Sequence, residues 1–425
     1  MAYIAVIGAG YVGLTCAAGL ASLGHQVICA DINEPRIAGL RAGIVPITEE
    51  GMPEAINAQV AAGRLEFVLG ARNASDRSNI HFLCLPTPQG HDGSADLTAL
   101  LTAVGEIGPT LPTGSVVVNK STVPVGSAQL VIDAIGREDI EVVSHPEFLR
   151  EGSAMADFTN PDRIVVGADD EATARRVGEL YASIGAPTLY TDTKSAELIK
   201  YSANAFLATK LTFVNEMAEV CEQVGADIEA VMKGMGMDRR IGSSYLSPGP
   251  GWGGSCFPKD TEALLHIAAS ADVEFDFLRS VIELNYRHLA RIAGKVTTML
   301  GGDVDGKRIA AWGLTFKAGT DDLRDSPSLA VLRLLEAEGA DIVAYDPEVS
   351  APPAELPHIK ITGTALEAAR DAKCVVVLTE WPEFADVDVD ELAEIMASRC
   401  VVDARNLLDA GALAERSFSY VGVGR

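Results

Sequence analysis

The sequence predicts a mixed α/β protein in which two doubly wound domains flank a central helical region. Short apolar runs alternate with helical segments near the N-terminus, and the same alternation resumes after Gly306. Between them lies a block rich in Ala, Leu, Glu and Met, with helical spacing and few strand signals. We therefore expect Rossmann-like domains at residues 1–195 and 301–425, joined by a helical dimerisation region at residues 196–300.

The N-terminal unit opens with a strand over Tyr3–Ile7, a glycine-rich turn and a helix over Leu14–Leu23. The turn has GxGxxG spacing, formed by Gly8, Gly10 and Gly13. Such glycines permit a tight turn and close approach to a pyrophosphate, whose negative charge meets the helix N-terminus. A second strand over Gln26–Ala30 ends at Asp31, an acid suited to ribose hydroxyls. This order of elements predicts dinucleotide binding.

Asp31 also bears on which dinucleotide is bound. It favours NAD over NADP, because a carboxylate repels a 2′-phosphate. Arg36 leaves NADP open as an alternative, since an arginine there could pair with that phosphate. We expect NAD as the cofactor.

Further strands are predicted in both α/β halves. The first half continues through Ile80–Leu85, Ser115–Lys120, Glu141–Ser144 and Arg163–Gly167. The second half has strands at Lys307–Trp312, Asp341–Tyr345, Cys374–Leu378 and Cys400–Asp403, with a helix at Ser328–Glu338. This half lacks GxGxxG and has only Gly313 after its first strand. The central block could hold one or two helices over Ala196–Val224, and a simple interdomain connector is the alternative to a dimer interface.

The bulk composition excludes several kinds of partner and site. The formal net charge of −25 argues against nucleic acid and anionic membrane. The 7 cysteines are widely spaced without a CxxC pair, which fits a reducing cytoplasm rather than a disulfide framework or a zinc site. The apolar run Ile4–Leu23 lacks a basic leader, and no other segment is apolar enough to span a bilayer. We expect a cytoplasmic protein without a metal site.

The most informative stretch is the glycine-rich loop Gly249–Ser255, which ends at Cys256. Pro258 is suited to the first turn of a helix, so Cys256 is expected beside a helix N-terminus. That position and Lys259 favour the thiolate, whereas Asp260 opposes it. A thiol beside a carboxylate predicts covalent catalysis through a thioester. The alternative is a buried structural cysteine.

Several motifs together make the chain resemble the UDP-glucose/GDP-mannose dehydrogenase family along nearly its whole length. They are Gly8–Gly13, Lys120–Gly126, Pro146–Gly152, Glu197–Phe206, the Cys256 loop, Phe316–Lys317 and Asp325–Pro327. The resemblance implies oxidation of UDP-glucose to UDP-glucuronate, with two hydrides passing to two successive NAD molecules. An aldehyde carbon carries no hydroxyl that could lose a proton while a second hydride leaves that carbon, so a cysteine adds to it. The thiohemiacetal is oxidised to a thioester and then hydrolysed, and the resemblance makes Cys256 the nucleophile.

The resemblance also assigns the other catalytic groups. Lys200 and Asn204 stand one helical turn apart and resemble the pair that stabilises the developing oxyanion. Asp260, with Thr122 and a water, is similar to the group that takes the alcohol proton. Glu147 resembles the base for thioester hydrolysis. Taken without the family, the Lys–Asn pair could be a solvated helix face and Glu147 a surface or capping residue.

Binding residues are implied in the same way. The implied cofactor contacts are Gly8, Gly10, Val12, Gly13, Asp31, Arg36, Thr87, Thr122, Glu151, Lys259 and Arg324. The implied substrate contacts are Phe148, Leu149, Lys200, Asn204, Arg240, Tyr245, Leu246, Gly253, Phe316, Lys317 and Arg405. Arg240 matches an arginine that reaches into the partner subunit's site, which implies a homodimer.

Three other functions remain open. The same chemistry on GDP-mannose or another nucleotide sugar differs only in the binding pocket. A two-electron dehydrogenase of the hydroxyacid type would share the Lys–Asn pair and give no role to Cys256. A non-catalytic nucleotide-binding scaffold is the third, and the intact Cys256, Lys200, Asn204 and Asp260 argue against it.

Overall fold

The computed structural model describes residues 1–90 and 93–425. The chain divides into two compact units. Unit 1 holds Met1–Ala203 with Glu262–Asp272, and unit 2 holds Asn204–Thr261 with Val273–Arg425. The predicted domain limits at residues 195 and 300 stay a prediction.

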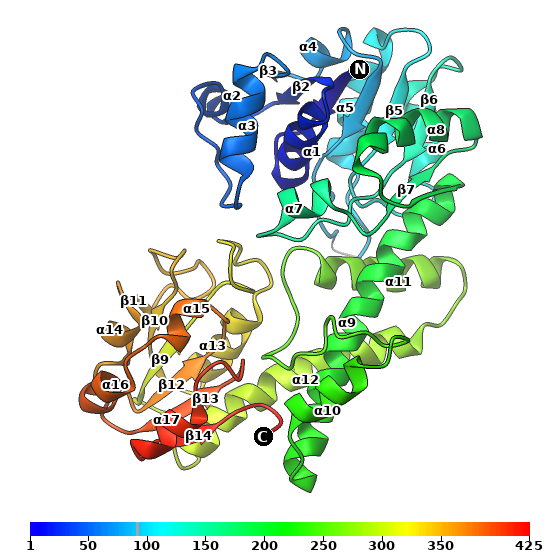
Figure 1. Cartoon of the computed structure of the whole chain (residues 1–425). Helices are drawn as coiled ribbons and strands as arrows, with labels where there is room; N and C mark the ends of the chain where they lie inside the picture. The colour runs from blue at the N-terminus through cyan, green and yellow to red at the C-terminus, as the bar shows by residue number, and fades with distance from the viewer. Residues whose placement is uncertain (91–92) are drawn as a thin grey trace. The chain divides into compact units, whose positions relative to one another are not determined.

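Unit 1 is built on an eight-stranded sheet with the order β3-β2-β1-β4-β5-β6-β7-β8 (Figure 1). The strands are β1 (Tyr3–Ile7), β2 (Gln26–Asp31), β3 (Leu65–Leu69), β4 (Ile80–Leu83), β5 (Val116–Asn119), β6 (Glu141–Ser144), β7 (Ile164–Gly167) and β8 (Thr188–Thr191). All neighbouring pairs are parallel except β6 with β7. The order 3-2-1-4-5-6 is that of a dinucleotide-binding domain, so ligands are expected at the carboxyl ends of the strands.

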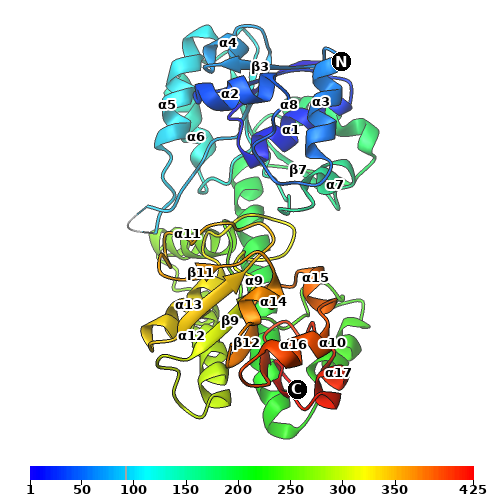
Figure 2. The same cartoon turned by 90° about the vertical axis from the view of Figure 1, so that its left-hand side faces the viewer.

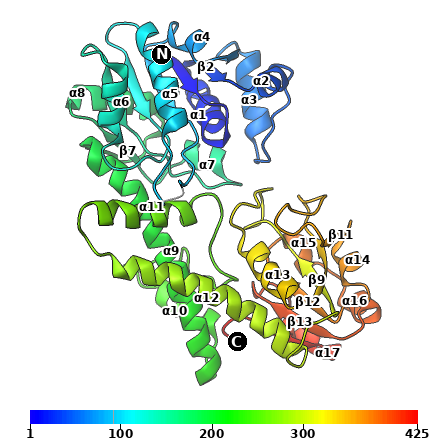
Figure 3. The ribbon, with the colours of Figure 1, turned by 180° about the vertical axis from the view of Figure 1, so that it is seen from behind.

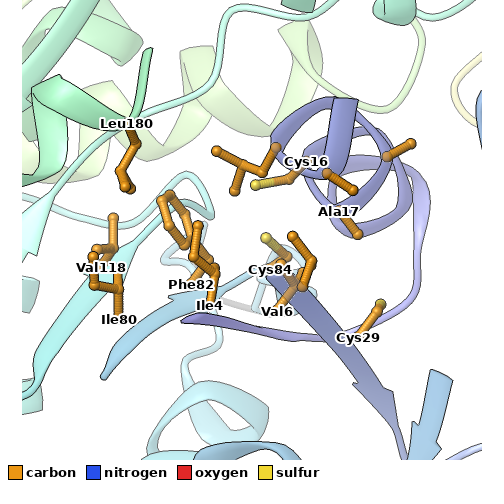
Figure 4. Packing of buried hydrophobic residues seen from close by; sticks show 14 of the residues in the cluster. Ile4, Val6, Cys16, Ala17, Cys29, Ile80, Phe82, Cys84, Val118 and Leu180 are labelled. Atoms are coloured by element: carbon orange, nitrogen blue, oxygen red, sulfur yellow. The ribbon is translucent and has the colours of Figure 1, made fainter. Parts of the chain in front are cut away.

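Helices cover both faces of this sheet. They are α1 (Tyr11–Ser22), α2 (Glu34–Arg41), α3 (Met52–Ala61), α4 (Arg72–Ser75), α5 (Thr98–Ile107), α6 (Ser127–Ile135), α7 (Ala154–Thr159) and α8 (Glu171–Gly178), with 3-10 turns at Gly108–Thr110 and Glu179–Ile184. Figure 2 shows α5 and α6 together, apart from α1 and α3. Alternate side chains of each strand enter opposite cores: Ile4 and Val6 pack with α1, whereas Ala5 and Ile7 pack with α5 and α6. Figure 4 shows the first core, where Cys16 and Ala17 lie beside Val6 and Cys84.

The helical block consists of α9 (Thr193–Val224), α10 (Ile228–Gly236), α11 (Phe257–Ser270) and α12 (Asp276–Met299). A single helix of 32 residues therefore spans the region for which one or two helices were expected. Its stretch from Ser195 to Val224 contains no glycine or proline, so nothing in the local sequence interrupts the hydrogen-bond ladder. The boundary between the two units passes through α9 between Ala203 and Asn204.

Unit 2 repeats the doubly wound arrangement with a six-stranded parallel sheet of order β11-β10-β9-β12-β13-β14 (Figure 3). Its strands are β9 (Arg308–Trp312), β10 (Asp341–Tyr345), β11 (Lys360–Ile361), β12 (Cys374–Val377), β13 (Cys400–Asp403) and β14 (Ser419–Val421). Its helices are α13 (Pro327–Ala337), α14 (Ala365–Ala369), α15 (Pro382–Ala385), α16 (Val389–Ile395) and α17 (Ala410–Glu415). α12 and α13 line one core, and α14 to α17 line the other. The predicted fold class, two Rossmann-like domains joined by a helical region, is confirmed.

Candidate active site

The GxGxxG turn between β1 and α1 has a geometry that only glycine permits. Gly8 has φ of +104°, and a Cβ there would lie 2.3 Å from the carbonyl oxygen of Cys84. A Cβ on Gly13 would lie 1.8 Å from the carbonyl oxygen of Gly8. A Cβ on Gly10 would meet open space, and Gly10 caps α1 without a side-chain hydrogen bond. The first amides of α1 therefore have room for the diphosphate of a dinucleotide.

Asp31 at the end of β2 is held by three donors. Its carboxylate accepts hydrogen bonds from the Ala9 amide at 2.8 Å and the Asn33 amide at 2.8 Å. The Arg36 guanidinium lies 3.3 Å from Asp31 Oδ2. The Asp31 carboxylate thus occupies the place that a 2′-phosphate would need. Arg36, which left NADP open as an alternative, is paired with this carboxylate. These residues fit NAD.

The loops after β4 and β5 meet near the same turn. Thr87 Oγ1 donates to the carbonyl oxygen of Thr122 at 2.8 Å. The hydroxyl of Ser121 donates to the Leu85 carbonyl at 2.7 Å and accepts from the Leu85 amide at 2.8 Å. The structure therefore brings the predicted cofactor residues Thr87 and Thr122 together.

Glu49 is a residue of this region that the sequence analysis missed. Its buried carboxylate accepts from the Tyr11 hydroxyl, and from the amides of Gly152 and Ala154 at 2.7 Å each. It thereby fixes the residues around Val12, in the first turn of α1, and around Glu151. No sequence signal marked it, because its partners are 38 to 105 residues away.

Glu147 and Lys200 form a buried ion pair in unit 1. Lys200 Nζ lies 2.9 Å from Glu147 Oε1, and the two side chains are 4% and 7% exposed. Burial opposes the ionisation of Glu147, but Lys200, the Leu149 amide at 2.6 Å and nearby Lys120 outweigh it, so its pKa lies below the usual range. Glu147 is therefore an anion at neutral pH.

The Phe148 ring lies near two cations. The Lys200 ammonium is 5.5 Å from the centre of its ring, and the Arg163 guanidinium carbon is 3.7 Å away. Leu149 packs against the core that α1 also lines. The Pro146–Gly152 motif and Lys200 are thus neighbours in unit 1.

A second buried lysine lies close by. Lys120 Nζ is 3.2 Å from His145 Nε2, and His145 Nδ1 is 2.6 Å from the carbonyl oxygen of Val165. The carbonyl can only accept, so Nδ1 carries the ring proton and Nε2 accepts from the ammonium. Burial and the charge of Lys120 lower the pKa of His145 well below its usual range, which keeps the ring neutral.

The glycine-rich loop of unit 2 is pinned by α9 and α12. Asn285 accepts from the Trp252 amide at 2.9 Å and donates to the Trp252 carbonyl at 3.0 Å. The Trp252 indole donates to Thr212 Oγ1 at 2.8 Å, and Asn215 accepts from the Gly249 amide at 3.0 Å. The loop therefore has a fixed course up to the nucleophile candidate.

Cys256 directly precedes α11. Its carbonyl accepts from the Asp260 amide at 2.9 Å, so it occupies the N-cap position, and its Sγ lies 3.5 Å from Ser255 Oγ. Of the groups expected around it, Asp260 is the best defined: this buried carboxylate accepts from Asn204 Nδ2 at 2.6 Å and Lys259 Nζ at 2.5 Å. Cys256 is half-buried, whereas five of the other cysteines are buried.

The predicted substrate residues of unit 2 surround the same loop. A Cβ on Gly254 would lie 2.8 Å from the Phe316 ring, and one on Gly249 would lie 2.9 Å from the Arg405 guanidinium. Arg405 pairs with Glu380 at 2.9 Å and donates to the Phe316 carbonyl at 3.3 Å. Only glycine lets the backbone pass this close to both side chains.

The remaining substrate candidates lie on either side of this loop. A Cβ on Gly253 would lie 1.9 Å from the Asp325 carbonyl oxygen, and the Lys317 ammonium is 5.5 Å from the Phe316 ring centre. Tyr245 has φ of 61°, an uncommon value for a non-glycine residue, and its ring centre is 6.4 Å from that of Phe257. Leu246 is buried in the unit 2 core.

The two remaining arginines pair locally. Arg324 lies 2.6 Å from Asp322, and Arg240 lies 2.6 Å from Asp238. The Arg240 side chain is 89% exposed. Within the described part of the chain, its guanidinium contacts Asp238 and none of the other predicted site residues.

Unit 2 has an acid in the place that Asp31 holds in unit 1. Asp346 follows β10, but its Oδ2 accepts from the Leu314 and Thr315 amides at 2.7 and 3.0 Å. The same oxygen accepts from the Trp381 indole at 3.1 Å. Asp346 thus fixes the turn after β9, which has Gly313 but lacks the GxGxxG spacing.

Comparison with known proteins shows that these features occur together in one protein family. The three domain models of one family match in order: the NAD binding domain at residues 2–185, the central domain at 194–287 and the UDP binding domain at 310–410. The chain belongs to the UDP-glucose/GDP-mannose dehydrogenase family. It is therefore an NAD-dependent oxidoreductase that acts on a nucleotide sugar.

Relatives of this dehydrogenase match it from end to end. It is 43% identical to a UDP-glucose 6-dehydrogenase of Rhizobium meliloti, over 99% of both chains. It is also 43% identical to UDP-glucose 6-dehydrogenase YwqF of Bacillus subtilis, over 99% of this chain and 97% of the relative. The structure of a UDP-glucose dehydrogenase from Pyrobaculum islandicum superimposes with a TM-score of 0.90 at 35% identity, covering 100% and 98% of the two chains.

None of the helices in the described residues is both long and apolar enough to cross a membrane.

Proposed function

We propose that this dehydrogenase oxidises UDP-glucose to UDP-glucuronate through a thioester on Cys256. The proposal is carried by the end-to-end similarity to UDP-glucose 6-dehydrogenases at 43% identity, joined to an intact Cys256 loop. GDP-mannose or another nucleotide sugar is the alternative substrate, and a two-electron oxidation is the alternative reaction.

The thiol makes the second oxidation chemically possible. Removal of a hydride and a proton from the C6 alcohol gives an aldehyde, which carries no hydroxyl. Addition of the Cys256 thiolate to the carbonyl carbon creates a thiohemiacetal, whose new hydroxyl loses a proton as a second hydride leaves. Water then displaces the thiolate from the thioester and gives the acid. NAD, when bound, accepts the hydride in each of the two oxidations.

Asp260 is proposed to take the alcohol proton, with Thr122 and a water. Its bonds to Asn204 and Lys259 support this role, because two donors fix the orientation of the carboxylate. Asn204 and Lys200 are proposed to stabilise the oxyanion, one with a neutral donor and the other with a charged one.

Glu147 is proposed as the base for thioester hydrolysis. In the ion pair with Lys200 its pKa is depressed, which makes it a weak base. A developing oxyanion draws the Lys200 charge away, and the buried carboxylate then regains basicity because burial raises its pKa. The ion pair thus links the stabilisation of the oxyanion by Lys200 to the proton transfer by Glu147 during thioester hydrolysis.

Substrate profiling tests the proposal directly. Purified protein is supplied with UDP-glucose or GDP-mannose, and NADH is measured against sugar consumed. We expect turnover of UDP-glucose with two NADH per sugar. Turnover of GDP-mannose alone would reassign the substrate, and one NADH per sugar would reassign the reaction.

We also propose that the active form is a homodimer in which Arg240 binds the partner's substrate. α9 exposes Phe206, Phe213 and Val220 at seven-residue intervals, which places three apolar side chains along one helix face. A second copy of the chain would bury this face. The exposed guanidinium of Arg240 is free of the unit 2 core and suited to a phosphate.

The Arg240→Ala variant is expected to raise the KM for UDP-glucose about 10- to 100-fold, because a charge-assisted hydrogen bond to phosphate is lost. Arg239→Ala serves as the matched control and should leave KM unchanged. Mixing the Arg240→Ala and Cys256→Ser proteins should restore about a quarter of the wild-type sites, since each mixed dimer has one complete site. Unchanged KM in Arg240→Ala, or no restoration on mixing, would reject the shared site.

A further inference from the structure

Glu197 is a buried carboxylate to which none of the functions above gives a role. It lies on α9, three residues before Lys200, and is 3% exposed. Its two oxygens accept three hydrogen bonds, all from residues more than fifty positions away in the sequence. Burying a carboxylate costs free energy unless hydrogen bonds compensate for the lost water, so these three donors are needed to keep Glu197 buried.

Two of the donors form the start of α6. The Gly126 amide donates to Glu197 Oε2 at 2.6 Å, and the Ala128 amide donates to Oε1 at 3.0 Å. Gly126 is the N-cap of α6 and has no side chain with which to cap it. Glu197 therefore supplies the cap from another element. The Gly126 amide ends the Lys120–Gly126 segment, which carries Thr122.

The third donor comes from β6. Ser144 Oγ donates to Glu197 Oε1 at 2.9 Å. Ser144 is the last residue of β6 and stands three residues before Glu147. One carboxylate thus joins three segments of unit 1, and each of them carries one of the proposed catalytic groups Thr122, Glu147 and Lys200.

We propose that Glu197 is a positioning residue that sets the spacing between Lys200, Glu147 and Thr122. This inference rests on the proposed function, because that function gives the three groups their roles. Both oxygens accept in these three bonds, a set that the ionised carboxylate satisfies. A glutamine retains one accepting oxygen and turns an NH2 group toward a donor, which breaks at least one of the three bonds.

The Glu197→Gln variant tests the inference. We expect kcat to fall about 10- to 100-fold, as when a catalytic group is displaced by about 1 Å, and to fall by a larger factor than KM for NAD rises. Asp170→Asn is the matched control. Asp170 also caps a helix of unit 1, with Thr173 donating at 2.8 Å, but it touches none of the three segments. The control should leave kcat unchanged.

Hydrogen exchange provides a readout that does not depend on turnover. In Glu197→Gln we expect faster exchange in peptides covering residues 120–128 and 144–149, and unchanged exchange in β1 and α1. Asp170→Asn should show faster exchange at the start of α8 alone. A wild-type protein that does not oxidise UDP-glucose would overturn the proposed function. The exchange pattern would still show whether the hydrogen bonds of Glu197 hold the two segments in place.

The Ser144→Ala variant covers the case in which Glu197→Gln fails to fold. It removes one of the three bonds and leaves both amide bonds, so kcat should fall about 2- to 10-fold. Loss of kcat in Glu197→Gln with exchange localised to the two segments supports the inference. A kcat within twofold of wild type in Glu197→Gln, or in Ser144→Ala if the first does not fold, would overturn it.

Discussion

Replacing Cys256 with serine is expected to reduce complete turnover of UDP-glucose by on the order of 10³-fold or more. The serine hydroxyl is far less acidic than the thiol and attacks an aldehyde poorly. The first oxidation does not need the sulfur, so the variant should still form aldehyde and release NADH in a first phase. Stopped-flow NADH absorbance measures both phases, and product analysis identifies the acid.

Cys400→Ser is the matched control, because Cys400 is the other cysteine that is not fully buried and lies in β13 of unit 2. It should keep two NADH per sugar and wild-type kcat. Full two-NADH stoichiometry in Cys256→Ser would instead point to a route without a covalent adduct.

Replacing Lys200 with methionine is expected to remove activity and also to destabilise the protein by about 3–5 kcal/mol at neutral pH, because it strands the buried Glu147 carboxylate. The direction in which stability changes with pH follows from the pKa of Glu147. In the wild type the depressed pKa of Glu147 contributes stability above its unfolded-state pKa, and this is lost as pH falls through the folded-state pKa. In the variant, burial raises that pKa against only the Leu149 amide and Lys120, so stability is lost as pH rises and partly regained in acid.

Urea unfolding between about pH 5 and 8 measures this reversal. The double variant Lys200→Met with Glu147→Gln should recover much of the lost stability without recovering activity, since the buried carboxylate that Lys200 neutralises is gone. Arg77→Met is the comparison at a surface pair with Glu66, where both side chains are about half exposed, and should cost less than about 1 kcal/mol. Equal stability losses at pH 5 and pH 8 in Lys200→Met would contradict the assigned charge state.

Several strands were predictable from sequence because each contains a run of buried residues that includes adjacent apolar side chains. β1, β6, β10 and β13 have the expected bounds. β8 (Thr188–Thr191) and β14 (Ser419–Val421) were not foreseen, because edge strands are partly exposed and their composition resembles that of a loop. β3 mixes buried and exposed residues over only five positions without strict alternation, too weak a pattern to stand out.

The candidate site divides in the same way. Local motifs predicted the GxGxxG turn, Asp31 and the Cys256 loop, because the residues that identify each feature are close together in the sequence. Glu49 and Glu197 could not be recognised, because what distinguishes a buried carboxylate is the set of donors that the fold brings to it from distant segments. The pairing of Glu147 with Lys200 was also invisible, although each residue was singled out on its own.

The acylation of Cys256 is the claim on which the proposed mechanism depends. Glu147→Gln protein, impaired in hydrolysis, is quenched during turnover of UDP-glucose and digested for mass spectrometry. The account predicts that the peptide containing Cys256 carries the uronyl group as a thioester, and that alkylating Cys256 stops acid formation. Absence of the adduct, together with undiminished UDP-glucuronate formation after alkylation, would contradict it.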